Sequence, residues 1–271
     1  MSWNDIKKSI HKAYVAYYLN CPVNRGKYRL ARTVHFLFGE ALYEFDGLKL
    51  MLSPVCGIGL RLISGSGHDP HVAAAIKDAL KDGGNFIDVG AHFGYMSLLA
   101  AKAVGSRGKV FAFEPSKREY TRLLRHIKLN GVSNIAAFNM GLSDKEESGF
   151  LNVSFLGNTG ANSRREIKLA QSRIPAKFAA AGDVIPEKEM ADVRCVKIDT
   201  EGDEVAVLKG FEKSMAHLAR ASFIVEITGI MLQAAGHTPQ DIYDFFARHS
   251  FKPVIAHSPK DLVQYDEIFK R

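Results

Sequence analysis

The sequence predicts an α/β protein built on an open, mostly parallel β-sheet with helices on both faces, preceded by an N-terminal helix and a β-hairpin. The first observation is that short apolar runs alternate with helix-like segments from residue 85 onward, which is typical of βαβ units. The second is that several of these runs end in glycines or charged residues, where open α/β sheets place their ligands. The third is size: 271 residues with 46% apolar side chains can bury one sizeable core.

The first 32 residues are basic and amphipathic. Their net charge is +6, out of +7 for the whole chain. Apolar residues recur at spacings of three and four from Trp3 to Tyr18, which predicts a helix with an apolar stripe. This helix either packs on the core or on a second subunit, or offers a surface to anionic lipid, acidic glycan or nucleic acid. We favour packing, with weak peripheral membrane contact as an alternative and the oligomeric state open.

Two further elements precede the sheet. Alternating apolar residues in 41–45 and 48–52 flank Asp46-Gly47, a strong hairpin signal. Asp69 and Pro70 are typical of an N-cap and a first helical position, so capping is the expected role of Asp69, although His68 and Asp69 could also reach a ligand. We divide the chain into an extension, residues 1–70, and a cofactor-binding domain, residues 71–271, with a polar insertion at 150–192.

The stretch 85–94 is the predicted cofactor seat. It contains a buried strand, 85–89, and a glycine turn that opens a helix over 95–104. Glycine lets the backbone approach a ligand, and the helix N-terminus directs free N–H groups to the same place. A side chain at position 90 would occupy the place of the ligand, while His92 either contacts the ligand or only packs locally. The predicted cofactor residues of this turn are Asp88, Gly90, His92 and Gly94.

A second predicted strand, 109–113, ends at Glu114, 20 residues after Gly94. An acidic side chain in this place accepts hydrogen bonds from the ribose hydroxyls of an adenosine. The alternative is that Glu114 caps the helix predicted over 117–130. The turn after a third strand, 135–138, would place Leu142 and Ser143 beside the adenine.

The turn favours a cofactor without phosphates. A nicotinamide cofactor requires Gly-x-Gly-x-x-Gly, because the middle glycine admits the pyrophosphate. In this chain His92 would crowd that group. S-adenosylmethionine has no phosphate, offers a ribose to Glu114 and a charged tail to the glycine turn, and is therefore the predicted cofactor.

Charged residues also follow the strand predicted from residue 193. Lys197, Asp199 and Glu201 stand at its end, and Glu226 ends a later strand. Because the carboxyl ends of parallel strands meet at one edge of a sheet, Asp199 and Glu226 are predicted to face one substrate pocket. Such charges are costly unless they are paired or used. An ion pair of Lys197 with either carboxylate would be a purely structural explanation.

Four stretches occur in the order seen in one known family. They are Asp88-Val-Gly-Ala-His-Phe-Gly94, Phe113-Glu-Pro-Ser116, Lys197-Ile-Asp-Thr-Glu-Gly202 with Glu204-Val-Ala-Val-Leu-Lys-Gly210, and Val225-Glu226. Over residues 45–255 the chain resembles the FkbM family of S-adenosylmethionine-dependent methyltransferases. The resemblance implies a Rossmann-like class I fold, a seven-stranded sheet with one antiparallel strand, and methylation of a hydroxyl, often on a sugar or polyketide. It carries cofactor roles onto Asp88, Gly90, Gly94 and Glu114, whereas the family usually has Asn where this chain has His92.

Methyl transfer to an alcohol requires alignment of the acceptor oxygen and removal of its proton. Asp199 is the expected general base, or it ligates a divalent metal together with Glu226; no metal is part of the predicted cofactor set. Glu201 is expected to orient the loop or to bind the amino group of the cofactor. In the insertion, sugar hydroxyls are assigned to Asn158, Asn162 and Ser163, and an anionic group to Arg164 and Arg165.

The predicted function is an S-adenosylmethionine-dependent O-methyltransferase acting on a sugar, a glycan or another secondary-metabolite hydroxyl. Three widely spaced cysteines, no signal-peptide pattern and no apolar run of about 20 residues place it in the cytoplasm. Nucleic acid is a disfavoured partner, because Cys195 lies inside a strand and no Asp/Asn-Pro-Pro-Tyr/Phe signature occurs. The rival functions are an RNA methyltransferase, suggested by the basic N-terminus, and a non-catalytic cofactor-binding module or NAD enzyme.

Overall fold

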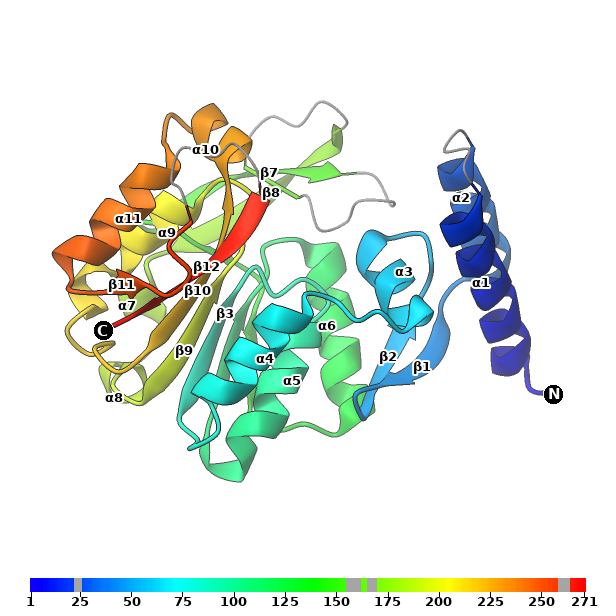
Figure 1. Cartoon of the computed structure of the whole chain (residues 1–271), viewed down its shortest axis with the longest axis horizontal. Helices are drawn as coiled ribbons and strands as arrows, with labels where there is room; N and C mark the ends of the chain where they lie inside the picture. The colour runs from blue at the N-terminus through cyan, green and yellow to red at the C-terminus, as the bar shows by residue number, and fades with distance from the viewer. Residues whose placement is uncertain (22–25, 155–161, 165–169, 258–263) are drawn as a thin grey trace.

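The computed structural model describes residues 1–21, 26–154, 162–164, 170–257 and 264–271. Its centre is a seven-stranded sheet in which only β12 runs antiparallel to its neighbours (Figure 1). Across the sheet the strands are β11 (Lys252–Pro253), β12 (Gln264–Lys270), β10 (Ser222–Thr228), β9 (Val193–Ile198), β3 (Asn85–Val89), β4 (Val110–Phe113) and β5 (Ile135–Phe138). This order confirms the predicted fold class, including the single antiparallel strand.

Helices cover both faces of the sheet, which explains why its strands are nearly continuous apolar runs. One face carries α4 (Pro70–Ala79), α5 (Tyr95–Val104) and α6 (Lys117–Asn130); the other carries α7 (Ala181–Val184), α9 (Glu204–Phe211) and α11 (Pro239–Arg248). Successive residues of β3 point to opposite faces, so Phe86 packs in one core and Ile87 in the other. The short helices α8 (Glu187–Met190) and α10 (Gly229–Ala234) and the 3₁₀ turns Gly105–Arg107 and Glu212–Ser214 complete this domain.

The N-terminal extension contains three helices where the sequence predicted one. They are α1 (Trp3–Asn20), α2 (Lys27–Phe38) and α3 (Gly57–Ser64). The two additional helices lack strong start signals: the N-cap of α2 is Gly26 without a side-chain cap, and α3 contains Gly57 and Gly59, which disfavour helix formation. Among the described helices, none combines the length and apolar character that a bilayer crossing requires.

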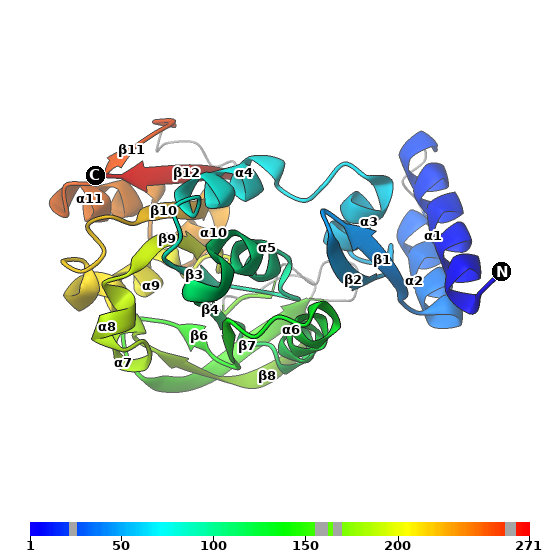
Figure 2. The ribbon, with the colours of Figure 1, turned by 90° about the horizontal axis from the view of Figure 1, so that it is seen from below.

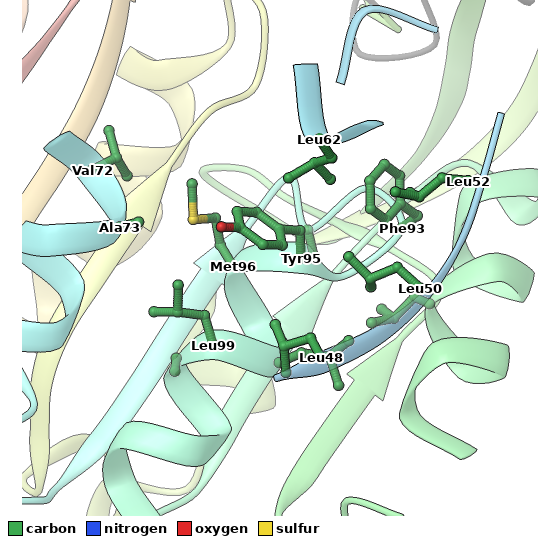
Figure 3. Packing of buried hydrophobic residues seen from close by; sticks show 14 of the residues in the cluster. Leu48, Leu50, Leu52, Leu62, Val72, Ala73, Phe93, Tyr95, Met96 and Leu99 are labelled. Atoms are coloured by element: carbon green, nitrogen blue, oxygen red, sulfur yellow. The ribbon is translucent and has the colours of Figure 1, made fainter. Parts of the chain in front are cut away.

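The predicted hairpin is a part of the extension that packs against the sheet domain. Its strands are β1 (Ala41–Phe45) and β2 (Leu48–Leu52), and both turn residues, Asp46 and Gly47, have positive φ, as a tight hairpin turn requires. Figure 3 shows the leucines of β2 packed with side chains of the glycine turn and of α5. The buried ring of His126 in α6 adds a polar link, because Nε2 accepts from the backbone N of Met51 at 2.9 Å while Nδ1 donates to the carbonyl of Phe93 at 2.8 Å.

The polar insertion is more regular than its sequence suggests. Strands β7 (Glu147–Ser154) and β8 (Ala170–Ala179) form an antiparallel pair, and β8 also pairs with β6 (Gly141–Leu142). This three-stranded sheet buries a small apolar core of its own around Leu151 and Phe178. It lies beside the main sheet below β4 in Figure 2.

Asp69 does occupy the N-cap position of α4, with Pro70 following it, but its side chain makes no capping hydrogen bond. Capping requires an extended N-cap backbone, whereas Asp69 has a φ of 43°. Its carboxylate instead lies 3.0 Å from Nδ1 of His68. The predicted capping role is therefore wrong.

Candidate active site

A cavity of about 410 Å³ opens at the carboxyl edge of the parallel strands, a volume within the roughly 300–1,000 Å³ range of small-molecule sites. The ends of β3, β4, β9 and β10 contribute to it, together with α3 of the extension and the β7–β8 pair. Most of the predicted site residues line it: Asp88, Gly90, His92, Glu114, Leu142, Asp199, Glu201 and Glu226. Gly94 and Ser143 are not among the lining residues.

The glycine turn is fixed to both neighbouring strands. The backbone N atoms of Gly90 and Ala91 each donate to the carbonyl of Phe113 at 3.0 Å, and Asp199 N donates to the carbonyl of Val89 at 3.0 Å. Gly90 has a φ of 85°, and a Cβ there would collide with the backbone carbonyl of Asp199. The main reason for a glycine at this position is therefore that the backbone at the end of β9 lies too close for a side chain. The expectation that a side chain at this position would only displace a ligand is wrong.

Gly94 also serves packing. It is the N-cap of α5 with a φ of 91°, and a Cβ at this position would collide with the side chain of Leu123 in α6. It therefore shapes the turn from outside the cavity.

Asp88 is buried at the floor of the cavity. Its Oδ2 accepts a hydrogen bond from Ser97 Oγ at 2.5 Å, and its Oδ1 has no hydrogen-bond partner among the described residues. Burial raises the pKa of Asp88, and the charge of Lys197 opposes that shift. A buried, unpartnered acceptor beside a glycine turn fits a polar or cationic group of a bound ligand.

Glu114 is held with its carboxylate at the cavity wall. Its Oε2 accepts from the backbone N of His92 and its Oε1 from the backbone N of Ser116, both at 2.8 Å. The second bond reaches the N-cap residue of α6, so a role in starting this helix coexists with cavity exposure. Burial raises the pKa of Glu114 to about 8. A carboxylate oxygen has more than one acceptor site, so two ribose hydroxyls still fit.

The position of His92 allows both roles that the sequence left open, contact with a ligand and local packing. It lines the cavity, and its Nε2 also lies 3.5 Å from Glu119 Oε2. Its ring lies 4.9 Å from that of Phe93, and its φ of 51° keeps the turn tight. Burial lowers the pKa of His92 to about 4, so the ring is neutral at physiological pH.

Apolar side chains line the cavity beyond Glu114, together with the guanidinium of Arg164, whose Cζ lies 4.2 Å from the ring centroid of Phe178. Leu142 lines this wall together with Pro115, Leu151 and Phe178. Ser143 is buried behind this wall and accepts a hydrogen bond from Arg164 at 3.1 Å. The contribution of Leu151 and Phe178 was missed, because it depends on the folding of the insertion over the sheet edge.

Three carboxylates meet on the opposite side. Asp199, Glu201 and Glu226 each offer an oxygen, and these oxygens lie within 4.8 Å of one another. Such a set of oxygen donors could hold a divalent cation. Lys197 Nζ donates to Asp199 at 2.8 Å and Gln264 donates to Glu226 at 2.7 Å. The ion pair that the sequence offered as a structural explanation is thus present, inside the cavity.

The environment gives these carboxyl groups different protonation states. Burial alone would raise the pKa of Asp199, but the adjacent Lys197 ammonium holds it below its usual range. Burial and the charge of Asp199 raise the pKa of Glu226 to about 10 and that of Glu201 to about 8. At neutral pH Asp199 is the charged member of the cluster and Glu226 carries a proton.

Among the described residues, no hydrogen bond from the loop reaches the carboxylate of Glu201. The loop is held instead by Glu204, whose Oε1 accepts from Thr200 N, Thr200 Oγ1 and Gly202 N at 3.0–3.2 Å. Glu201 has a φ of 53°, and its own backbone carbonyl accepts from Ser163 Oγ at 2.7 Å.

The extension and the insertion add charged groups at the cavity mouth. Arg61 of α3 donates to Nδ1 of His68 at 3.0 Å, and both residues line the cavity with Asp69. Arg164 lies 2.6 Å from Glu147.

Two lining residues, Arg61 and Tyr95, were not singled out from the sequence, where they look like an ordinary helix charge and a core aromatic. Of the predicted acceptor residues, Asn162 and Arg164 line the cavity, while Asn158 and Arg165 lie outside the described residues.

Two comparisons of the sequence with known proteins found methyltransferases. The model of the methyltransferase FkbM domain matches residues 88–253, more than half of the chain. The methyltransferase sdnD of Sordaria araneosa is 26% identical over 165 residues, which cover 49% of this chain and 62% of that protein. The chain thus spans less than two thirds of the length of this relative.

Solved structures show similarity of fold alone. A putative rRNA-methylase from Clostridium thermocellum has a TM-score of 0.44 and 12% identity, covering 74% of this chain and 93% of its own. An rRNA methylase from Streptococcus thermophilus has a TM-score of 0.46 and 10% identity, covering 74% and 94%.

Proposed function

We propose, from the premise that this chain belongs to the FkbM methyltransferase family, that it transfers a methyl group from S-adenosylmethionine to a hydroxyl oxygen of a neutral, polyhydroxylated molecule. Sugars, glycans and hydroxylated secondary metabolites are the acceptor classes we assign. The observation that carries the proposal is the position of Asp199, Glu201 and Glu226, which gather at the same sheet edge as the predicted cofactor seat and across the same cavity.

The cofactor residues have separate tasks in this proposal. When bound, S-adenosylmethionine supplies an electrophilic methyl group on a sulfonium. Glu114 accepts hydrogen bonds from the ribose hydroxyls, the unpartnered Oδ1 of Asp88 faces the polar tail, and Gly90 brings the backbone close. The apolar wall around Leu142 surrounds the adenine and excludes water from that end.

Asp199 is the proposed acceptor-side residue. Lys197 keeps it charged, so it can orient an acceptor hydroxyl and take up its proton as the oxygen–carbon bond forms. A carboxylate with a lowered pKa is a weak base, and the same three oxygens could instead hold a divalent cation that acidifies the alcohol. The two mechanisms differ in their need for metal.

His68 is a second candidate for the base. Asp69 lies 3.0 Å from its Nδ1, and a proton held there leaves a lone pair on Nε2, as in catalytic His–Asp pairs. Arg61 competes for the same Nδ1 atom at 3.0 Å. An acceptor that displaces Arg61 would complete the pair.

The charge of the cavity supports a neutral acceptor over RNA. Its acidic lining residues are Asp69, Asp88, Glu114, Asp199, Glu201, Asp203 and Glu226, against the basic residues Arg61, Arg164 and Lys197. Burial keeps several of these acids protonated, but basic groups still do not dominate the described lining, whereas proteins that bind RNA present basic surfaces to it.

The test is an acceptor screen with S-adenosylmethionine labelled on its methyl group. Sugars and hydroxylated metabolites should yield methyl ethers, and RNA should remain unlabelled. EDTA and Mg²⁺ distinguish the two mechanisms, because turnover that survives EDTA requires no metal. Labelled RNA in the absence of labelled alcohols would overturn the proposal.

A further inference from the structure

Exposed apolar side chains gather at the N-terminal end of the molecule. Among the described residues, most of the large apolar side chains that face solvent lie within the first 37 residues. We call the solvent-facing residues of α1 and α2 the N-terminal surface; its apolar members are Trp3, Tyr17, Tyr18, Leu19, Leu30, Phe36 and Leu37. Phe36 is 87% exposed and Leu37 59%. Apolar groups gathered in this way mark interaction sites.

The N-terminal surface is separate from the active site. The two helices lie side by side at one end of the molecule, opposite α11 (Figures 1 and 2). None of their described residues lines the cavity. The extension is anchored through the β2 leucines and α3 instead, so this surface remains open to a partner.

The solvent face of α2 is both apolar and basic. Ala31 and Val34 are buried on the inner face, while Arg29, Arg32 and Phe36 are exposed. These three residues are spaced by three and four positions and therefore share one strip of the helix. Leu30 and Leu37, seven residues apart, lie along its edge. A solvent face that carries arginines beside apolar side chains is typical of helices that lie in a membrane interface.

The positive charge of the N-terminal surface favours an anionic partner. Residues 1–32 have a net charge of +6. Lys7 and Lys27 donate to backbone carbonyls of Glu40 and Tyr18, whereas Lys12, Arg29 and Arg32 are exposed. Within the described part of the chain, no ion pair involves these three cations.

We propose that the N-terminal surface docks this chain on an anionic lipid surface. Basic side chains are attracted to anionic headgroups, and the leucines and Phe36 supply the apolar contact that fixes the helices in the interface. A second copy of the chain fits less well, because a two-fold interface would bring two strongly basic surfaces together. RNA would stack on aromatic rings but offers no apolar contact to Leu19, Leu30 and Leu37.

Vesicle co-sedimentation of the full chain tests the proposal. Vesicles of phosphatidylcholine mixed with phosphatidylserine should bind the chain at least roughly tenfold more tightly than phosphatidylcholine alone, and salt should weaken the binding. Phe36→Ser combined with Leu37→Ser should reduce binding at least roughly tenfold at unchanged charge. Arg29→Glu combined with Arg32→Glu should abolish the preference for phosphatidylserine.

Ile230→Ser is the matched control, since Ile230 of α10 is 64% exposed and lies outside the basic region. Circular dichroism and S-adenosylmethionine affinity should be unchanged in every variant, which keeps the test independent of folding and of the active site. Equal binding to both vesicle types, or no binding to either, would overturn the proposal. So would a dimer in sedimentation that Phe36→Ser with Leu37→Ser dissociates, or RNA binding that replaces vesicle binding.

Discussion

The proposed cofactor half of the cavity is built around one stretch of chain, residues 88–114, and is completed by Leu142 and the β7–β8 pair, whereas the proposed acceptor half combines α3 with the ends of β9 and β10. Asp88, Gly90 and Glu114 stand on adjacent parallel strands whose register fixes them directly. Asp199, Glu226 and Arg61 are brought together only by the complete sheet and the docked extension. In the proposed arrangement, local motifs build the cofactor seat and tertiary packing builds the acceptor site, where specificity can change without loss of the seat.

The largest expected effect is a loss of turnover on substitution of Asp199, and it distinguishes the acceptor half from the cofactor half. Asp199→Asn keeps the shape of the side chain and removes its charge, so turnover should fall by roughly 10²–10⁴-fold. Cofactor affinity should stay within a few-fold, because our proposal assigns Asp199 to the acceptor and not to the cofactor. Steady-state kinetics and calorimetry measure the two quantities. Turnover at the wild-type rate would move the role to His68 or Glu226.

Gly90 of the cofactor half lies directly against the backbone of Asp199 in the acceptor half. Gly90→Ala should cost more than about 3 kcal/mol of unfolding free energy, because it combines a left-handed backbone with a collision against Asp199. Gly83→Ala is the matched control: Gly83 has the same φ of 85° but nothing within 4 Å of its Cβ position. It should cost only about 1–2 kcal/mol. Equal losses in urea unfolding would show that the contact with β9 is unimportant.

Glu114 tests the cofactor half alone. Glu114→Ala should weaken S-adenosylmethionine binding by about 2–4 kcal/mol, because two hydrogen bonds to a carboxylate are lost. Glu146→Ala, at an exposed position, should leave affinity unchanged in the same calorimetric titration. A folded Glu114→Ala variant with wild-type affinity would remove Glu114 from the site.

Glu201 couples the stability of the chain to pH. Burial and the charge of Asp199 raise the pKa of Glu201 to about 8 in the folded chain, from an ordinary value of 4.5. The folded state therefore binds this proton more tightly than the unfolded state, and the associated stability is complete below pH 4.5 and lost as pH rises to about 8. Glu201→Gln cannot ionise, so its melting temperature should gain on the wild type between pH 5 and pH 8. A constant difference would exclude this coupling.

The sequence predicted the strands and helices between residues 85 and 130 well because their information is local. The bounds of α5 and α6 and the Asp46-Gly47 turn follow from apolar periodicity and turn chemistry. The predictions that failed concern residues whose roles depend on the folded structure around them. The necessity of Gly90 lies in a neighbouring strand more than 100 residues later, and Asp69 pairs with His68 because its backbone is left-handed. Phe178 reaches the cavity only because the insertion folds into a sheet.

The most direct test of the account is a crystal structure of the chain with S-adenosylhomocysteine. We expect the ribose hydroxyls within hydrogen-bonding distance of the Glu114 carboxylate, the adenine against Leu142, and the sulfur directed toward Asp199 and Glu226. A nucleoside bound outside this cavity, or one whose sulfur points away from the carboxylates, would contradict it.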